Sequence, residues 1–549
     1  MRIALLLRNL KRHVNGWTVT SMTGAAVILL PILYLLLSLF LPPNDNWSTV
    51  KQFLLTDYVL GSARLVVMTT FFAVCIGVAF AWLVVGYTFP LRNVFKWALA
   101  LPLAMPPYIA AYTYSMMTGY TGIIQATLRN RFGIVLPPGI IEVMSERGAV
   151  FVLTLFLFPY VFMITRAFLE RQSASYIENA RLLGHRPLSV FIRVVLPLAR
   201  PAIMAGGMLV VFEVLSDYGV ANYFGVQTIS TAIFQTWFGM YDMASAMRLA
   251  AWLMIGVISL FILEHWLRRN RRYSDTTSQT HPLKPKALKG AAAWVACMSC
   301  GLLLLLAFLA PFIQLIAWSV QYGAKIWRSD FAELALNTLQ GAGIATALIL
   351  LVALLSSRAV RMIDSPFMQA LARLISAGYS VPGAIIAIGV LAVFTVLDGW
   401  LSPLYGSLGL GEGSLVLSLS LAMLLTGYVI RYMATGYSAL ESGYEKIPRA
   451  YSEASRTLGR SSLVTFIRVE LPLLKGSLLS GFVLTFVEII KELPLTLLLR
   501  PFNYDTLSTR AYQYATDERV FEAALPSLLL VLIGLVTVLF ILNPERRSI

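Results

Sequence analysis

The chain has 549 residues, of which 58% are hydrophobic and only 13% are charged. This composition excludes a soluble globular protein of this length, because too few polar residues are present to cover its surface. The net charge of +16 does not indicate nucleic-acid binding, since the sequence has no basic, aromatic-rich soluble domain to provide it. We expect most of the chain to face membrane lipid.

Twelve apolar stretches follow one another along the chain, and each is close to the ~20 residues that a helix needs to cross a bilayer. The stretches are continuous rather than alternating, so they predict helices and not the strands of a membrane barrel. The expected fold is all-α, a polytopic membrane protein with about 12 transmembrane helices. The predicted spans are residues 18–41, 62–85, 95–116, 148–167, 201–219, 246–266, 291–320, 336–357, 371–397, 414–437, 476–497 and 524–543.

Prolines fall inside the third and ninth predicted spans, as Pro106-Pro107 and Pro382-Gly383. A proline interrupts a helix because it has no backbone N–H. Broken helices at these points fit either a transport site lined by free backbone groups or a simple kink between packed helices.

Lys and Arg collect before the first span, between the sixth and seventh spans, and after the last span. By the positive-inside rule all three places are cytoplasmic, so we expect both chain ends on that side. These basic residues also attract anionic lipid head groups. Residues 268–290, which are polar and basic and contain Pro282 and Pro285, predict a flexible cytoplasmic linker.

The sequence repeats itself at a fixed difference in residue number, which we call the repeat offset. The same offset of 275 separates Glu178 from Glu453, Gly184 from Gly459 and Pro107 from Pro382. A repeat of this length is a domain-sized half rather than a stacking unit. We expect a first half at 1–267 and a second at 291–549, with six helices each. Because both motifs are expected on the cytoplasmic side, the halves are parallel repeats with a translocation path between them.

Each copy of the repeated motif predicts a short helix, a break and a second helix. In the first copy Ser175 and Glu178 form a capping box, Gly184 ends the first helix and Pro187 begins the second. In the second copy Pro448 precedes the helix, and the break and the next cap follow. The apolar face of the first helix contains Ile177, Ala180 and Leu183, and the second copy has its break at Gly459 and its cap at Ser461.

A short amphipathic helix on the cytoplasmic side has two interpretations. It lies flat on lipid as an anchor, or it is a lever that fits a groove on a soluble partner. Two copies at identical spacing favour the lever, because they suggest a symmetric, two-part partner.

The strings Glu178-Asn-Ala-Arg-Leu-Leu-Gly184 and Glu453-Ala-Ser-Arg-Thr-Leu-Gly459 are each followed by Leu-Pro, at Pro197 and Pro472. They resemble the EAA loops of bacterial ABC importer permeases, here at about 171–200 and 442–475. Asn179 and Ser455 depart from strict Glu-Ala-Ala. The resemblance implies that a short helix couples the membrane subunit to cytoplasmic ATPases, through Glu178, Ala180, Gly184, Glu453, Ala454 and Gly459.

Further segments resemble the fused ferric iron permeases of the same family. They are Tyr223-Phe-Gly-Val-Gln-Thr228, Trp237-Phe-Gly-Met240, Lys491-Glu-Leu-Pro-Leu-Thr-Leu-Leu-Leu-Arg-Pro501 and Asp505-Thr-Leu-Ser-Thr509. The resemblance implies iron(III) import across the bacterial inner membrane, with two cytoplasmic ATPase subunits and one periplasmic iron(III)-binding protein. The chain has no phosphate-binding loop of its own, so we expect no cofactor in it, no enzyme activity, and ATP-Mg bound by the partner ATPase.

Acidic residues interrupt the fifth and eleventh spans at matching positions, as Glu213 with Asp217 and Glu488 with Glu492. Four-residue spacing puts each pair on one helix face, and carboxylates suit a hard cation such as iron(III). The sequence assigns no metal ligand firmly. These acids fit a transport path, docking of the binding protein, or structural pairing with basic residues such as Lys491 and Arg500.

Two other functions fit the same pattern. One is an ABC importer of thiamine, polyamine or another small solute. The other is a secondary transporter that needs no ATPase, which parallel repeats permit but which has no use for duplicated docking loops.

Overall fold

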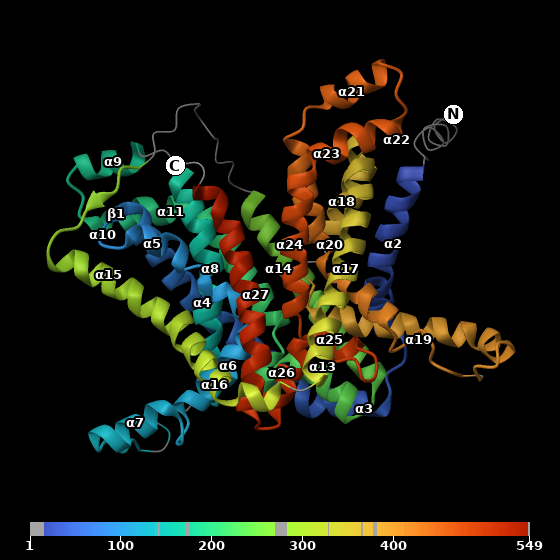
Figure 1. Cartoon of the computed structure of the whole chain (residues 1–549), viewed down its shortest axis with the longest axis horizontal. Coiled ribbons are helices and arrows are strands. Elements are labelled where there is room, and N and C mark those ends of the chain that lie inside the picture. Colours follow the sequence, from blue (N-terminus) through green and yellow to red (C-terminus); the bar gives the residue numbers. More distant parts are fainter. Residues whose placement is uncertain are drawn as a thin grey trace. The chain divides into compact units, whose positions relative to one another are not determined.

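Figure 1 shows the computed structural model of the chain. The structure describes residues 16–137, 139, 143–171, 175–269, 283–327, 329–363, 366–376, 381–411 and 413–546. Within these residues the chain is almost entirely helical, and its only strands are β1 (Tyr87–Thr88) and β2 (Lys286–Ala287), which pair in parallel. The prediction of an all-α membrane protein is confirmed.

The described helices fall into two compact units. Unit 1 consists of the described parts of Met1–Asp45, Thr236–Trp252 and Arg328–Thr509. Its helical elements are α2 (Gly16–Leu37), η1 (Ser38–Phe40), α17 (Ser329–Met362), α18 (Pro366–Ser376), α19 (Gly383–Ser407), α20 (Leu421–Glu445), α21 (Arg449–Thr457), α22 (Ser462–Thr465), η8 (Phe466–Glu470), α23 (Leu471–Leu473), α24 (Lys475–Lys491) and α25 (Pro494–Leu499).

Unit 2 consists of the described parts of Asn46–Gln235, Leu253–Trp327 and Arg510–Ile549. Four helical elements contribute residues to both units: α3 (Asp45–Thr49), η5 (Gln235–Gly239), α14 (Met243–Arg269) and α26 (Leu507–Thr516). The other helical elements of unit 2 are η2 (Val50–Leu54), α4 (Leu55–Gly86), α5 (Arg92–Ala98), η3 (Leu101–Ala104), α6 (Pro107–Thr118), α7 (Ile123–Phe132), α8 (Glu146–Arg171), α9 (Ser175–Leu182), α10 (Pro187–Val190), η4 (Phe191–Val195), α11 (Leu196–Ser216), α12 (Gly219–Tyr223), α13 (Ile229–Phe234), α15 (Ala291–Leu304), η6 (Leu305–Leu309), α16 (Ala310–Ile326) and α27 (Val520–Arg546).

Each unit has a core of three long helices from one half of the sequence. In unit 1, α17 packs against α20 and α24; in unit 2, α4 packs against α8 and α11. The three helices of one core correspond to those of the other at the repeat offset, so the sequence repeat is also a repeat of packing.

Some outer helices of each unit come from the other half of the sequence. In unit 1, α2 packs on α17 and α19, whereas in unit 2, α15 packs on α5 and α16 packs on α6. Helix α2 is apolar on all sides, so it can bury one face against any apolar partner while the other face remains suited to lipid. The compact units therefore do not follow the halves 1–267 and 291–549, and that division of the sequence remains a prediction.

Nine described helices are long and apolar enough to cross a membrane, or eleven if each of two bent helix pairs is one span. The predicted span without such a counterpart is 414–437, which overlaps α20. This helix has 25 residues, but Arg431 is buried in its middle and donates a hydrogen bond to the Val381 carbonyl. This arginine lowers the hydropathy of α20 below that of the nine helices. Its hydrogen bond inside unit 1 indicates that α20 is a core helix.

The predicted proline breaks are present in both halves. Arg92–Ala104 and Pro107–Phe132 meet at 91°, with Pro106 as the extended residue before α6. Helix α19 likewise begins at Gly383, directly after an extended Pro382.

Candidate functional site

The first repeated motif folds in unit 2 as a helix, a turn and a second helix. Helix α9 ends at Leu182, and Gly184 follows with a φ of +76°. Across this turn the His185 amide donates to the Ala180 carbonyl at 3.2 Å. Helix α10 begins at Pro187, where a missing N–H leaves no bond unmade.

The second motif folds in the same way in unit 1. After α21, Gly459 has a φ of +78°, and the Arg460 amide donates to the Ser455 carbonyl at 3.2 Å. Ser461 caps α22 as predicted, since its hydroxyl accepts the Val464 amide at 3.3 Å. A Cβ added at either turn glycine would meet nothing within 4 Å. Glycine is therefore favoured by the left-handed backbone and not by lack of space.

A wide helical turn precedes the Leu-Pro of each motif. The Leu196 amide donates to the Phe191 carbonyl, five positions back, and the Leu471 amide does the same to Phe466. The proline that follows has no amide to donate, so the regular pattern is interrupted at this place in both copies. The two loops are thus matched in backbone from the first helix to the Leu-Pro.

The outer faces of the two loops also match at four apolar side chains, although exposed Leu182 has Thr457 as its equivalent. Four pairs of large apolar residues, each related by the repeat offset, are between 51% and 80% exposed. They are Tyr176 and Tyr451, Leu183 and Leu458, Leu188 and Leu463, and Ile192 and Ile467. The prediction that Leu183 shares one helical face with Ile177 and Ala180 was wrong, because α9 ends one residue earlier and the turn carries Leu183 outward.

The inner face of the first loop is apolar. Ile177 and Ala180 of α9 are 2% and 7% exposed, and they belong to one buried cluster with Trp82 of α4 and Leu169 of α8. Leu283, from the end of the predicted linker, packs against the same cluster. Strand β2, which follows Leu283, pairs with β1 directly after α4, so this part of the linker is tied to the base of the first loop.

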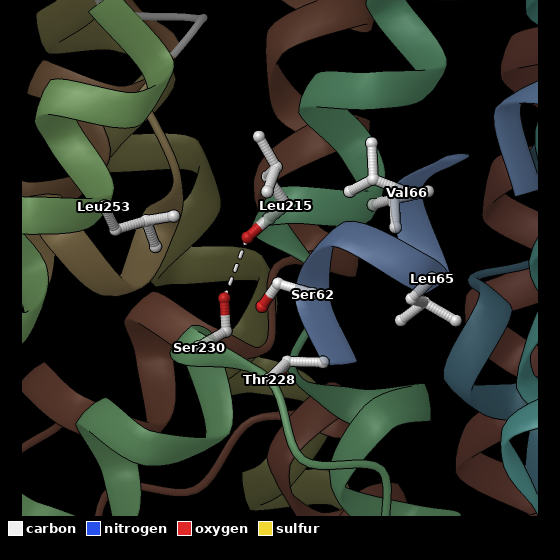
Figure 2. A pocket seen from close by; sticks show the side chains of 8 residues that line it. Ser62, Leu65, Val66, Leu215, Thr228, Ser230 and Leu253 are labelled. Atoms are coloured by element: carbon white, nitrogen blue, oxygen red, sulfur yellow. Dashed lines mark hydrogen bonds between the residues drawn. The ribbon is translucent and has the colours of Figure 1, made fainter. Parts of the chain in front are cut away.

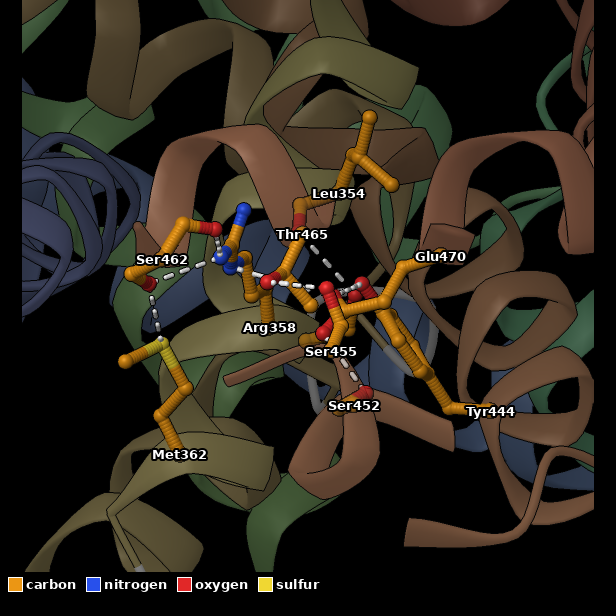
Figure 3. A network of polar contacts seen from close by, with 10 residues as sticks. Leu354, Arg358, Met362, Tyr444, Ser452, Ser455, Ser462, Thr465 and Glu470 are labelled. Atoms are coloured by element: carbon orange, nitrogen blue, oxygen red, sulfur yellow. Dashed lines mark hydrogen bonds and ion pairs between the residues drawn. The ribbon is translucent and has the colours of Figure 1, made fainter. Parts of the chain in front are cut away.

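The inner face of the second loop is polar, as Figure 3 shows. Glu470 of η8 and Arg358 of α17 are 5% and 1% exposed, and the Arg358 Nε lies 3.8 Å from Glu470 Oε2. Ser452 of α21 donates to Glu470 Oε1 at 2.9 Å. In the same network Ser455 Oγ lies 2.9 Å from Thr465 Oγ1. No local motif marks these residues in the sequence, but they are polar at positions where the first half, aligned at the repeat offset, has apolar residues.

The six residues that the family resemblance implicates in coupling do not all lie on the outer face. Ala180 is buried and Glu178 is half-buried. The side chain of Ser175, the other half of the predicted capping box, lies outside the described residues. The remaining four are exposed: Gly184, Glu453, Ala454 and Gly459.

The acidic pairs lie at the ends of α11 and α24 and not along one helical face. Both helices end just before the second acid of each pair, and Asp217 and Glu492 have extended backbone with ψ of 128°. Asp217 Oδ2 accepts the Val220 and Ala221 amides, at 3.1 and 3.0 Å, at the start of α12. Glu492 Oε1 accepts the Leu495 amide at 3.0 Å at the start of α25. These two acids cap the short helices that follow the breaks.

Glu492 also lies beside the predicted break in the ninth span. A Cβ at Gly383 would be 2.9 Å from Glu492 Oε1, and the Tyr432 hydroxyl donates to the same carboxylate. Its partner in sequence, Glu488, accepts a hydrogen bond from Lys491 Nζ at 2.9 Å. Among the described residues no group of three or more His, Cys, Asp or Glu side chains is arranged to hold a metal ion.

One small pocket lies in unit 2, near the end of α11, and Figure 2 shows its lining residues. Ser230 Oγ donates to the Leu215 carbonyl at 2.8 Å, and Ser62 Oγ accepts the Ile229 amide at 2.9 Å. The cavity measures about 10 Å³, which is at the lower limit for a single water molecule. It is therefore too small for a transported solute.

The comparison with protein families shows which family the chain belongs to. A family described as "binding-protein-dependent transport system inner membrane component" matches the chain twice, at residues 74–272 and 350–548. The chain belongs to this family. The starts of the two matches, at 74 and 350, agree with the repeat offset to within one position. The protein is a multi-pass transport subunit of the inner membrane, and the family works with a binding protein and an ATPase.

Two relatives named as ferric permeases align with most of this chain, whereas a third relative aligns with less than half of it. The Fe(3+)-transport system permease protein FbpB 2 of Haemophilus influenzae is 25% identical over 485 residues, 87% of this chain and 88% of the relative. The ferric transport system permease protein FbpB of Actinobacillus pleuropneumoniae is 24% identical over 412 residues, 71% of this chain and 56% of the relative. The molybdenum transport system permease protein ModB of Escherichia coli is 32% identical over 223 residues, 39% of this chain and 93% of the relative.

Proposed function

We propose that this chain is the permease of an iron(III) importer and that its two loops receive force from two cytoplasmic ATPase subunits. In this proposal ATP-Mg is bound and hydrolysed by those ATPases, and a periplasmic binding protein delivers the iron(III). The observation that carries the proposal is the identity of four exposed apolar residues on the two loops. A partner with two equivalent grooves requires two equivalent apolar surfaces that fit them.

An anchor lying flat on lipid is the alternative for these helices. Lipid binding requires apolar character and does not distinguish one large apolar residue from another. At the four positions described above, the two loops instead have the same residue: Tyr, Leu, Leu and Ile. This residue-by-residue match favours contact with a shaped protein surface.

Both loops are proposed to lie on the cytoplasmic side, together with both chain ends. In Figure 1 the start of α2 and helix α21 lie at the upper end of unit 1. The end of α27 and helix α9 lie at the upper end of unit 2. These positions support the assignment from the positive-inside rule, since α2 follows and α27 precedes the basic ends of the sequence.

Iron(III) is the proposed cargo because relatives that align over most of this chain are named as ferric permeases. Molybdenum is the second candidate, because ModB has the higher identity within its shorter alignment. In either case Asp217 and Glu492 shape the breaks after α11 and α24 by capping α12 and α25. Glu213 and Glu488 are then the acids proposed to face the transport path or the docked binding protein.

The coupling proposal is tested by charge reversal on both loops, Glu178→Arg with Glu453→Arg. We expect normal amounts of the variant in the membrane, no co-purifying ATPase and no ATP-dependent uptake. The matched control is Glu333→Arg, which reverses an exposed carboxylate near the start of α17, outside both loops, and should leave both activities intact. Unchanged uptake in the double variant contradicts the proposal and favours an ATPase-independent transporter.

The cargo is tested separately, in cells without other iron or molybdenum importers. Labelled iron(III) and labelled molybdate are offered to cells that lack the chain and to cells that regain it. Iron uptake that returns with the chain supports the proposal. Molybdate uptake alone overturns the iron assignment and leaves the coupling proposal standing. Glu213→Gln with Glu488→Gln should lower uptake of the correct cargo without loss of ATPase binding.

A further inference from the structure

The two loops are supported by opposite chemistry at equivalent positions. Four buried apolar residues beneath the first loop are replaced, at the repeat offset, by polar or charged residues beneath the second. The pairs are Ile177 and Ser452, Ala180 and Ser455, Val190 and Thr465, and Val195 and Glu470. On α17, Arg358 stands where α4 has Leu83. The outer faces of the loops are alike while their supports differ.

Glu470 joins three helices through one carboxylate. Its Oε1 accepts from Ser452 on α21 at 2.9 Å, and its Oε2 accepts from the Tyr444 hydroxyl on α20 at 3.3 Å. The same Oε2 lies 3.8 Å from the Arg358 Nε on α17. Figure 3 shows these side chains converging beneath α21. The coupling helix is therefore linked directly to two long core helices of unit 1.

Arginines of α17 hold both ends of the second loop. Arg358 Nη2 donates to the Ser462 carbonyl at 2.5 Å and to its hydroxyl at 2.9 Å, at the start of α22. Its guanidinium also lies 4.2 Å from the ring centre of Phe466. One turn further on, Arg361 donates to the Tyr444 and Ile447 carbonyls at 2.7 and 2.8 Å. The segments before and after α21 are thus both fixed to α17.

Apolar packing and an ionic network respond differently to force. Apolar contacts have no preferred direction, so a helix resting on them can tilt and slide while its area remains buried. Charge-assisted hydrogen bonds depend on distance and angle, and a buried network holds its members in one geometry. When a partner displaces the second loop, α17 and α20 should therefore move with it. When a partner displaces the first loop, more of the displacement should be lost as tilting of α9 against its own core.

We propose that Arg358 and Glu470 are positioning residues that make the second loop the stiffer of the two force-transmitting elements. They fix the angle of α21 so that movement of a docked ATPase is passed to α17 and α20. This inference rests on the proposed coupling function. It adds that the two loops are not interchangeable, although their outer faces are.

The decisive variant gives the second support the residues of the first, Arg358→Leu with Glu470→Val. Both charges leave together, so neither is stranded in the interior. We expect near-normal amounts in the membrane and normal co-purification of the ATPase, but at least a 5-fold fall in cargo transported per ATP hydrolysed. The matched control is Glu333→Gln, which removes an exposed carboxylate on α17, 25 positions before Arg358 and outside both loops; it should leave that ratio unchanged.

A purely structural role predicts something else, namely that amount, ATP hydrolysis and uptake fall together while the ratio of uptake to hydrolysis stays constant. An unchanged ratio in the double variant overturns the inference. If the double variant fails to accumulate, Ser452→Ala decides, because it removes only the bond between half-exposed α21 and Glu470. It should lower the ratio about 2-fold or more, and an unchanged ratio again overturns the inference.

The two proposals fail in different ways. If the unaltered chain binds no ATPase and transports without ATP, the proposed function is wrong. If the unaltered chain is coupled and the altered support transports equally well per ATP, only the inference about Arg358 and Glu470 is wrong.

Discussion

The left-handed turn after α21 provides the sharpest prediction, through the substitution Gly459→Ala. Gly459 has a φ of +78°, and an added Cβ would meet nothing within 4 Å. The substitution therefore introduces no clash, and its cost is the left-handed backbone alone, about 1–2 kcal/mol for a residue with a Cβ. With RT near 0.59 kcal/mol, that cost shifts the balance between closed and frayed turn by roughly 5- to 30-fold.

The Arg460 amide reports this shift, because it donates to the Ser455 carbonyl at 3.2 Å only while the turn is closed. We expect its hydrogen exchange in detergent or nanodiscs to accelerate about 5- to 30-fold. Gly459→Asn should accelerate exchange less, since asparagine tolerates the left-handed region better than alanine does. The same substitution at Gly184 should act in the same way on the His185 amide of the first loop.

The matched control is Gly476→Ala in α24. This glycine also has nothing within 4 Å of an added Cβ, but its φ is not positive. Alanine is favoured over glycine in a helix, so exchange at Arg460 should not change. Equal exchange in Gly459→Ala and the unaltered chain would refute the argument that the backbone alone requires glycine here.

Three further substitutions test the supports of the loops and breaks, each by thermal unfolding of the purified chain in detergent. Asp217→Ala removes the cap of α12 and should cost about 1 kcal/mol, whereas Asp217→Asn keeps an acceptor oxygen and should cost less; equal losses would contradict the capping role. Ile177→Ala opens a cavity beneath the first loop and should cost about 2–5 kcal/mol; an unchanged unfolding temperature would show that the buried cluster does not support α9. Arg358→Leu alone leaves Glu470 buried without its arginine and should cost about 3–5 kcal/mol, more than the double variant with Glu470→Val; the reverse order would show that the pair is not coupled.

Local rules explain why the loops were predictable from sequence. Gly184, Pro187 and Ser461 act through the backbone of their own turn, so their effect does not depend on the rest of the fold. The same rules failed at Leu183 because its orientation depends on where α9 stops, and a shift of one residue at a helix end moves a side chain to another face.

The acidic pairs show a different limit of sequence analysis. Four-residue spacing places two side chains on one face only while the helix continues. Helices α11 and α24 end at Ser216 and Lys491, so Asp217 and Glu492 leave the helix and cap the next one. Each acid lies three or four positions before the backbone amide whose hydrogen bond it accepts. This spacing is typical of a helix cap and is visible in the sequence, but it was interpreted as a pair of ligands.

The exchange of outer helices between the halves could not be predicted from periodicity. Helix α2 is apolar on all sides, and such a helix specifies burial without specifying a partner. The same holds for the polar support of the second loop. Arg358 and Glu470 lie far apart in the sequence, and only the fold reveals that they meet.

The contrast between outer and inner faces bears on the coupling hypothesis itself. In an ordinary repeat the buried positions are the more constrained, because a change in a packed interior costs stability while surface substitutions are usually near neutral. Here the pattern is reversed: exposed Tyr, Leu, Leu and Ile are identical in both loops, whereas Glu470 occupies the position equivalent to buried Val195.

The fold of the chain does not require that the exposed residues be identical, since the buried side chains of each loop have contacts of their own. A common requirement must then act from outside the fold, and a partner with two equivalent docking surfaces supplies it. Exchange of the four exposed residues of one loop for other apolar residues should therefore leave the stability of the chain unchanged and abolish ATPase binding at that loop alone. Loss of stability without loss of binding would remove the argument.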